Sequence, residues 1–291
     1  MTMPILFRVL FASPLFRRVA LTASFAVLVG LAPSAVLAQA GRPNAGALTF
    51  TGGLDAPTVY VFRGIVQEQE PKLTLFPYGD IGLTLKSDAD GARKTWLNVG
   101  VWNSLQTGSS GSEGFSEHLH YEEDFYAGLS FALTGRLSVG ATYTAYTSPN
   151  FMFDTVKEMS VKVAHSGRFS PYGLVAVELG DNGADGGENK GTYVELGAGP
   201  SFPLGKTSLT IPVKVGLSGK DYYELNGTDN KFGYFDVGAV VTLPLSSASS
   251  SFGAWNIHGG VDLLTFGKTT QAINGDKKTK VVALFGIGVT Y

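Results

Sequence analysis

Apolar and polar residues alternate along most of the chain after residue 47. The stretch 280–291 shows this most clearly: its apolar positions are Val281, Ala283, Phe285, Ile287, Val289 and Tyr291. The positions between them near the end are Gly286, Gly288 and Thr290. Successive side chains of a strand point to opposite faces, so this pattern predicts a strand with one apolar face and one face of small groups.

Similar alternating runs recur about every twenty residues, and turn-forming residues separate them. About twelve runs can be counted, with boundaries uncertain by a few residues. They are 48–62, 73–85, 96–104, 125–133, 136–146, 156–164, 171–179, 191–203, 208–217, 232–244, 254–265 and 280–291. A single-chain outer-membrane barrel needs an even number of strands. The pattern therefore predicts an all-β fold, a transmembrane antiparallel up-and-down β-barrel of about twelve strands.

The connections between the runs support this fold independently. Those after the odd-numbered runs are generally longer and more polar, such as 105–124, 181–190, 218–231 and 267–279. Those after the even-numbered runs are tighter, as at 134–135 and 205–207, and 87–94 is the longest of them. Long extracellular loops opposite short periplasmic turns are typical of outer-membrane barrels, and a soluble β-sandwich does not need this alternation.

Aromatic residues near the ends of the runs fit the girdles that mark membrane interfaces, although ordinary sheet packing also explains single cases. The candidates for these girdles are Phe76, Tyr143, Phe202, Phe235, Trp255 and Phe266.

The first forty residues have the features of a secretory signal peptide. Arg8, Arg17 and Arg18 form a basic start, 19–31 is apolar, and 38–40 reads Ala-Gln-Ala, a small–x–small cleavage signature. We expect cleavage after residue 40, with residue 38 as the alternative. A retained membrane anchor is the other interpretation, but the apolar run is short for a span. Residues 41–47 then form a short leader, and 48–291 the barrel.

Composition narrows the function classes. Charged residues make up 16% of the chain, 38 residues are glycine and none is cysteine, which excludes thiol catalysis and Cys-ligated metal sites. The formal charge is −2 from 22 basic and 24 acidic side chains, and it falls to −5 once a signal peptide with three arginines and no acid is removed. A mildly acidic chain argues against nucleic acid as a partner.

Two short segments carry a family resemblance. Residues 60–67 read YVFRGIVQ and residues 122–128 read EEDFYAG. Together they resemble the Gcw-type conserved hypothetical proteins, a bacterial family of expected outer-membrane barrels with Y-x-F-R-G-I-x-Q near the end of the first strand. Val59 and Val66 depart from the residues common there. The resemblance implies an outer-membrane barrel and no established activity.

Arg63 stands out within the first segment because it ends an apolar run beside Gly64. A guanidinium at this place can face the lumen and pair with a carboxylate, which fixes the first strand against its neighbours. The alternative is a loop arginine in water or near lipopolysaccharide phosphate.

Further charged residues fall on the face opposite the apolar one, where we expect the lumen. A charge on the lipid side costs about 2–4 kcal/mol for Arg or Lys at the midplane, which favours the inward placement. These lumen-lining candidates, beside Arg63, are Asp80, Glu158, Lys162, Glu178, Glu195, Lys214, Asp236, His258 and Asp262. They predict either a salt-bridge network that fills a narrow barrel or a polar pore with a preference for cations.

Three other segments contain residue types that can form chemical sites. His118 and His120 lie in an acidic stretch, 117–124, where a divalent metal is conceivable but a solvated loop is favoured. The stretch 181–186 resembles a calcium loop but fails the pattern at its third position, and Thr192 stands where the bidentate glutamate should be. His165 and Ser166 form an adjacent pair at an expected short turn, without a companion acid. We therefore expect no metal, no cofactor and no enzyme.

The leading functional expectation is an outer-membrane barrel that acts as a narrow porin-like channel for small polar solutes or cations. A non-conducting structural or adhesion barrel with a filled lumen is the alternative, and a barrel enzyme is the third. The expected partners are outer-membrane lipid, lipopolysaccharide and the barrel-assembly machinery, which would recognise the C-terminal strand ending at Tyr291.

Overall fold

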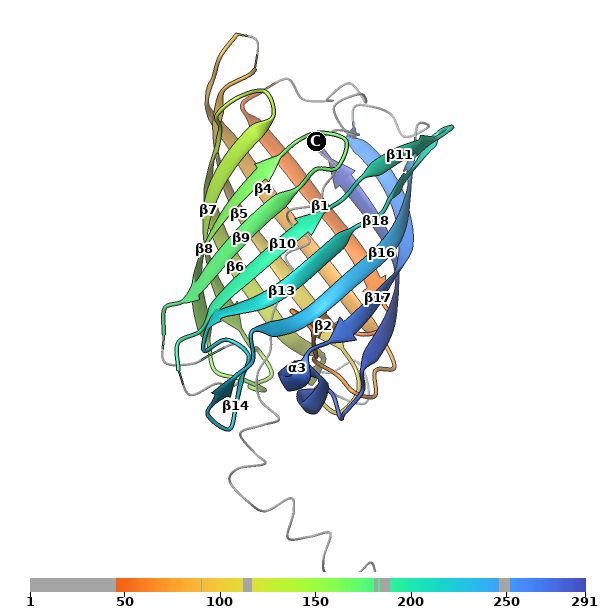
Figure 1. Cartoon of the computed structure of the whole chain (residues 1–291). Helices are drawn as coiled ribbons and strands as arrows, with labels where there is room; N and C mark the ends of the chain where they lie inside the picture. Colours follow the sequence, from red (N-terminus) through yellow and green to blue (C-terminus); the bar gives the residue numbers. More distant parts are fainter. Residues whose placement is uncertain (1–45, 90, 112–116, 181–182, 184–188, 246–251) are drawn as a thin grey trace, which may run out of the picture.

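The computed structural model describes residues 46–89, 91–111, 117–180, 183, 189–245 and 252–291. Within these residues the chain forms a closed antiparallel barrel of twelve strands (Figure 1). The barrel strands are β1 (Leu48–Pro57), β4 (Thr74–Ser87), β5 (Lys94–Gln106), β6 (His120–Ala132), β7 (Leu137–Thr147), β8 (Val156–His165), β9 (Tyr172–Glu178), β10 (Thr192–Ala198) with β11 (Ser201–Leu204), β12 (Thr207–Thr210) with β13 (Val213–Lys220), β16 (Phe232–Leu245), β17 (Ala254–Phe266) and β18 (Thr279–Thr290).

Two of the twelve strands are interrupted by proline. Pro200 lies between β10 and β11, and Pro212 lies between β12 and β13. Proline has no backbone N–H to donate to a sheet ladder, so regular pairing pauses at these positions.

The barrel closes where the first and last strands pair. Thr51 pairs with Thr290 and Pro57 with Leu284, in antiparallel register. Beyond the ladder, Phe50 and Tyr291 exchange two backbone hydrogen bonds, each of 2.8 Å. The predicted antiparallel up-and-down barrel of about twelve strands is thereby confirmed, with 280–291 as its closing strand.

The connections differ between the two ends of the barrel. The connections 58–73, 107–119, 148–155, 179–191, 221–231 and 267–278 start and finish at the loop end, and the tighter connections 88–93, 133–136, 166–171 and 205–206 start and finish at the turn end. The alternation of long and short connections predicted from the sequence is confirmed for these segments. The C-terminus lies at the turn end (Figure 1).

The first run was predicted too long. It was expected to be one strand over 48–62, but β1 ends at Pro57. The chain then forms a small hairpin from β2 (Val61–Phe62) and β3 (Ile65–Val66). We call residues 58–66 the lumen hairpin, because most of its side chains are buried inside the barrel: Tyr60 and Phe62 have an exposed fraction of 0%.

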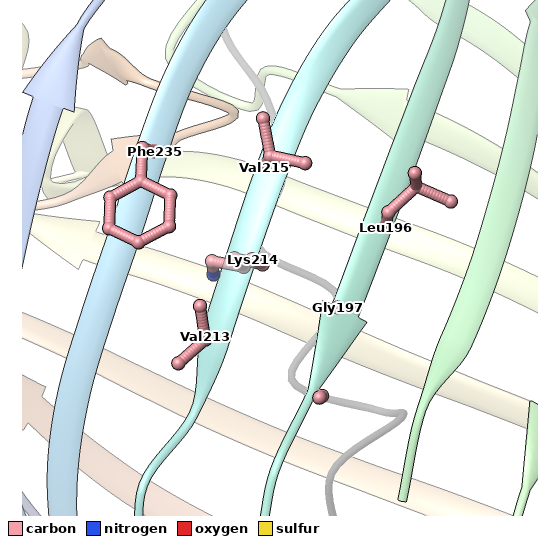
Figure 2. A pocket seen from close by; sticks show the side chains of 7 residues that line it. Leu196, Gly197, Val213, Lys214, Val215 and Phe235 are labelled. Atoms are coloured by element: carbon pink, nitrogen blue, oxygen red, sulfur yellow. The ribbon is translucent and has the colours of Figure 1, made fainter. Parts of the chain in front are cut away.

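The outer wall is apolar and exposed. Ile81, Val99, Phe125 and Phe285 expose more than half of their surface. Neighbouring residues on the same strands face inward, as Figure 2 shows for Lys214, which passes behind the sheet while Val213 and Val215 remain on its outer side. A shallow hollow of about 260 Å³ lies on this wall between Leu196, Val213, Val215 and Phe235. An outward apolar band with inward polar residues is the arrangement that a lipid environment favours.

Two of the six predicted girdle residues do not belong to the outer wall. Phe76 and Phe266 have exposed fractions of 4% and 6% and pack inside the barrel, which corrects the prediction. Phe76 lies four residues before Asp80 and Phe266 four residues after Asp262, so each shares the inward face of its strand. Tyr143, Phe202 and Phe235 do face outward, with exposed fractions of 37–40%.

Two short helical segments lie at the loop end. They are the 3₁₀ turn η2 (Glu117–Leu119) and the helix α3 (Lys268–Ile273). Neither has the length and apolar character that a membrane-crossing helix requires.

Candidate functional site in the barrel interior

The lumen hairpin turns on two residues in the left-handed backbone region. Arg63 has φ 42° and Gly64 has φ 83°. Two-residue hairpin turns favour positive φ at both central positions, a conformation that glycine adopts easily and arginine does not. A Cβ at Gly64 would also meet the ring of Tyr234 at 2.9 Å. The hairpin thus needs glycine at its tip and holds an arginine in a strained conformation beside it.

A buried ion pair holds that arginine in place. The Nη1 and Nη2 atoms of Arg63 donate to the two carboxylate oxygens of Glu158 on β8, at 2.7 and 2.9 Å. The Nη1 atom also donates to the hydroxyl of Tyr222 at 3.0 Å, and the Tyr146 hydroxyl donates to Glu158 at 3.0 Å. Both charged side chains are almost fully buried. Bidentate pairing with added hydrogen bonds is the geometry in which a buried ion pair is tolerated.

Aromatic rings surround the guanidinium of Arg63. Its central carbon lies 4.0 Å from the centroid of Tyr193, 4.8 Å from that of Phe62 and 5.3 Å from that of Tyr222. Attraction between a cation and an aromatic ring is strongest where water is excluded, as it is here. Arg63 is therefore held by rings and charge from three separate parts of the chain.

Other loops fasten the backbone of the lumen hairpin. The side chain of Asn274, just after α3, accepts from the Val66 amide at 2.8 Å and donates to the Gly64 carbonyl at 2.7 Å. The Tyr223 hydroxyl donates to the Arg63 carbonyl at 2.8 Å. These hydrogen bonds satisfy buried backbone groups, which are costly to leave unpaired.

Just after the lumen hairpin, the carboxylate of Glu68 connects two loops through hydrogen bonds. Glu68 accepts from the Ser110 amide at 2.6 Å and hydroxyl at 2.5 Å, from the Ser109 hydroxyl at 3.0 Å, and from the Glu70 amide at 2.8 Å. Burial alone would raise the pKa of Glu68, but these hydrogen bonds from Ser110, Glu70 and Ser109 together lower it. A Cβ at Gly108 would strike this carboxylate, so glycine is required there.

Buried aromatic and aliphatic side chains fill the interior around the hairpin. We call this cluster the aromatic core. It consists of Val59, Tyr60, Phe62, Val66, Phe76, Trp102, Tyr121, Tyr146, Phe153, Val156, Ala176, Tyr193, Tyr222, Tyr223, Tyr234, Leu264, Phe266 and Val282. The Tyr60 ring, for example, packs edge-on against Phe76 with centroids 5.1 Å apart. The loop-end half of the lumen is therefore occupied by protein.

Towards the turn end the interior is polar and partly exposed. We call this set the polar interior: Asp80, Asn98, Lys162, Tyr172, Glu195, Lys214 and His258, all of intermediate exposure. Its densest contacts surround Glu195, which accepts from the hydroxyls of Tyr172 at 2.7 Å, Tyr193 at 2.5 Å and Tyr234 at 2.9 Å. The Lys214 ammonium lies 3.2 Å from a carboxylate oxygen of Asp236.

A contact between a histidine and a carboxylate spans the seam of the barrel. The His258 Nε2 atom on β17 lies 2.9 Å from a carboxylate oxygen of Asp55 on β1. Gly286 of β18 lies between them in register. A Cβ at Gly286 would strike both side chains, so the contact exists only because this position is glycine.

Tyrosine rings lie over glycines of neighbouring strands at several inward positions. A Cβ at Gly100 would enter the ring of Tyr126, and a Cβ at Gly216 would enter the ring of Tyr234. The same holds for Gly197 and Tyr172. Glycine at these three positions thus allows close ring packing within the barrel.

The ten lumen candidates have the following places and contacts. Arg63 and Glu158 form a buried pair, and Lys214 and Asp236 form a partly exposed one. The remaining contacts of the ten are as follows: Asp80 accepts from Asn98 at 2.6 Å, the Lys162 ammonium lies 4.3 Å from the Tyr172 ring, Glu178 accepts from the Gly191 amide at 2.6 Å, and Asp262 lies against Gly238. Arg63 does not end the first strand, as its expected role required; it lies at the tip of the lumen hairpin.

The structure also places most of the residues that were considered as metal or catalytic sites. His118 belongs to η2 and His120 begins β6, so the two do not share one extended strand as expected; His120 lies 2.8 Å from Asn103. Among the described residues, no group of three or more His, Asp or Glu side chains is arranged to hold a metal. The Ser166 hydroxyl donates to the Arg136 carbonyl at 3.3 Å. The stretch 181–186 lies outside the described residues, apart from Gly183.

Sequence reasoning missed most of the aromatic core and its partners. It did not identify Glu68, Asn274 or Tyr222, which lie in loops without any pattern that marks them as buried. Phe76 and Phe266 could have been placed correctly, because they share strand parity with Asp80 and Asp262.

Comparison with known proteins shows only a general likeness. No family model matches the chain, and no curated protein is similar to it in sequence. An outer membrane channel from Pseudomonas putida F1 is 11% identical with a TM-score of 0.46, over 86% of this chain and 98% of that one. Outer membrane phospholipase A from Escherichia coli is 10% identical with a TM-score of 0.45, over 82% and 89%. Likeness at this level carries no argument about activity.

Proposed function

We propose that this chain is a bacterial outer-membrane β-barrel whose lumen is closed at the loop end, so that its resting state does not conduct. The observation that carries the proposal is the lumen hairpin, with Arg63 paired to Glu158 inside the barrel. Its exposed apolar wall and its alternation of long loops and short turns support a place in the outer membrane, with the loops outside. Export by a cleaved signal peptide over 1–40 is part of the proposal.

The arrangement of the hairpin argues against a constantly open pore. Its ion pair, its ring contacts and its backbone hydrogen bonds come from β8, β10 and the loops after β13 and β17. Removing one partner of a buried ion pair typically costs about 3–5 kcal/mol, so spontaneous withdrawal of the hairpin is rare. In this proposal the barrel acts through its loops and wall, as a structural or adhesion protein.

A narrow cation-preferring channel is the second candidate, and the polar interior supports it. The inward face carries the carboxylates of Asp55, Asp80, Glu195, Asp236 and Asp262 and the ammonium groups of Lys162 and Lys214. An excess of carboxylates favours cations in a pore. This channel conducts only if the lumen hairpin leaves the barrel.

Conductance of the folded chain in a planar bilayer tests the two candidates. The wild type should be silent, whereas a variant in which a short Gly-Ser linker replaces residues 59–66 should give discrete steps with a reversal potential that favours cations. Steady conductance by the wild type would overturn the closed-lumen proposal. A change in electrophoretic mobility on heating shows that both chains are folded.

The proposed partners follow from the same surfaces. Lipid and lipopolysaccharide would contact the apolar wall and the loops, and the barrel-assembly machinery would recognise the closing strand. Tyr291 is 43% exposed at the turn end of that strand, next to Phe50. We also propose membership of the Gcw-type family, whose first motif corresponds here to the lumen hairpin.

A further inference from the structure

A basic and apolar pocket lies on the outer wall at the turn end, away from the lumen. It has a volume of about 430 Å³ and is lined by Lys86, Asp88, Arg93, Lys94, Thr95, Phe131, Ala132 and Leu133. Lys86 and Arg93 are exposed, and neither forms an ion pair with another residue that the structure describes. The pocket therefore has a cationic part and an apolar part.

A β-bulge turns one of these cations outward. The register between β4 and β5 shifts between Thr84 and Lys86, so that Lys86 pairs with Thr95. Thr95 pairs in turn with Phe131, which is 40% exposed on the outer wall. Without the extra residue, Lys86 would share the inward face of Thr84. A β-bulge often changes the direction of a side chain near a functional site. Here it places the ammonium of Lys86 on the outer wall, where Phe131 also lies.

The apolar part of the pocket continues across the neighbouring strands of the wall. Phe131 and Leu133 are 40% and 46% exposed, and Phe131 pairs with Val139 in the next strand. Val139 pairs with the outward Val163. A chain of methylene groups could lie along this row while a charged group attached to it stays at the cations.

We propose that this pocket binds one anionic glycerophospholipid of the leaflet at the turn end. Lys86 and Arg93 hold the phosphate, and Phe131 with Leu133 contact an acyl chain. The inference rests on the proposed membrane location, in which short turns face the periplasm. The periplasmic leaflet of an outer membrane is built from phospholipids, whereas lipopolysaccharide occupies the other. Asp88 lies at the same pocket and limits its affinity for anions by repulsion.

The remaining turns reinforce the choice of an anion. The turn end also carries Arg136, Arg168 and Lys206, whereas Asp88 is the acidic residue of its described turns. Each cation near an anionic lipid surface contributes about a fivefold gain in binding. Loss of both Lys86 and Arg93 should therefore weaken binding about 25-fold.

Native mass spectrometry of the folded barrel in a neutral detergent tests the proposal, with phosphatidylglycerol and phosphatidylcholine as probes. The wild type should retain one phosphatidylglycerol in preference to phosphatidylcholine. The double variant K86Q/R93Q should lose the preference, and D88N should increase it. The matched control K157Q/K268Q removes two exposed cations at the loop end and should behave as the wild type.

Each other outcome overturns the inference. Equal retention by wild type and K86Q/R93Q would show that these cations hold no headgroup. Full competition by millimolar inorganic phosphate would show that the acyl chain adds nothing and that the ligand is free phosphate. A chain that is folded yet fails to insert into vesicles of any composition would end the membrane proposal as well. A chain that inserts but retains no anionic lipid would end only this inference.

Discussion

The aromatic core and the polar interior line the same barrel, yet they are built in opposite ways. In the aromatic core, residues as large as Trp102 and Tyr193 are 1% exposed, and its charged pair, Arg63 with Glu158, is closed off from solvent. In the polar interior, the Lys214 side chain of the pair with Asp236 is 31% exposed. Water can screen the second pair and cannot screen the first. Breaking an ion pair should therefore change the free energy of unfolding more in the aromatic core than in the polar interior.

The largest effect is expected where the buried pair is broken. Glu158→Ala leaves the Arg63 guanidinium buried without its carboxylate and should lower the free energy of unfolding by about 3–5 kcal/mol. Urea titration followed by tryptophan fluorescence measures the change. The double variant R63M/E158L removes both charges and should recover most of the loss. A single variant as stable as the wild type would show that the hairpin is not held by this pair.

A smaller loss is expected where a glycine accommodates a ring. Gly216→Ala places a methyl group in the ring of Tyr234 and should destabilise the barrel by about 1–3 kcal/mol, the usual cost of overpacking. Gly135→Ala is the matched control, because nothing lies within 4 Å of an added Cβ there. Equal stability of the two variants in the same urea titration would contradict the ring-over-glycine interpretation.

A still smaller effect is expected in the polar interior. Lys214→Gln removes a partly exposed ion-pair partner and should cost about 1 kcal/mol, well below the cost of Glu158→Ala. In the variant lacking residues 59–66, the same change should make conductance more selective for cations. A loss as large as that of Glu158→Ala would erase the distinction between the two regions.

The weakest predicted effect depends on pH and concerns the loop end. The pKa of Glu68 is lowered in the folded protein, so its contribution to stability is present above the ordinary carboxyl range and is lost as pH falls through the lowered pKa. Loop cleavage by pepsin should therefore increase as pH falls from 5 to 2, the range in which carboxyls take up protons. Glu68→Gln should be cleaved readily at pH 5 and show a flatter profile. A profile identical to that of the wild type would contradict this role of Glu68.

The barrel was predictable from the sequence because strands follow a local rule. Alternation with period two and turn chemistry located the twelve strands, and the same parity turned Asp80, Glu195 and Lys214 inward. The lumen hairpin was not predictable in this way. Its apolar residues, Tyr60 and Phe62, alternate just as a continuing strand would, and only the backbone reversal at Arg63 and Gly64 separates the two structures.

The candidate site was harder to predict than the fold, because its partners are distant in sequence. Arg63 and Glu158 are 95 residues apart, and Val66 and Asn274 are 208 apart. Nothing in one sequence connects such positions. A lumen pairing for Arg63 could be weighed from its charge and surroundings, but the identity of its partner could not.

The contact between His258 and Asp55 has a consequence for how the chain reaches its final form. These residues are 203 positions apart and meet only across Gly286, so the contact cannot form before β18 has been placed. Until then β1 and β17 each present an unpaired edge, the feature of sheets that invites association between chains. A polypeptide cut before Thr279 should therefore aggregate or be degraded. Barrel closure therefore depends on the pairing of β18 with both β1 and β17.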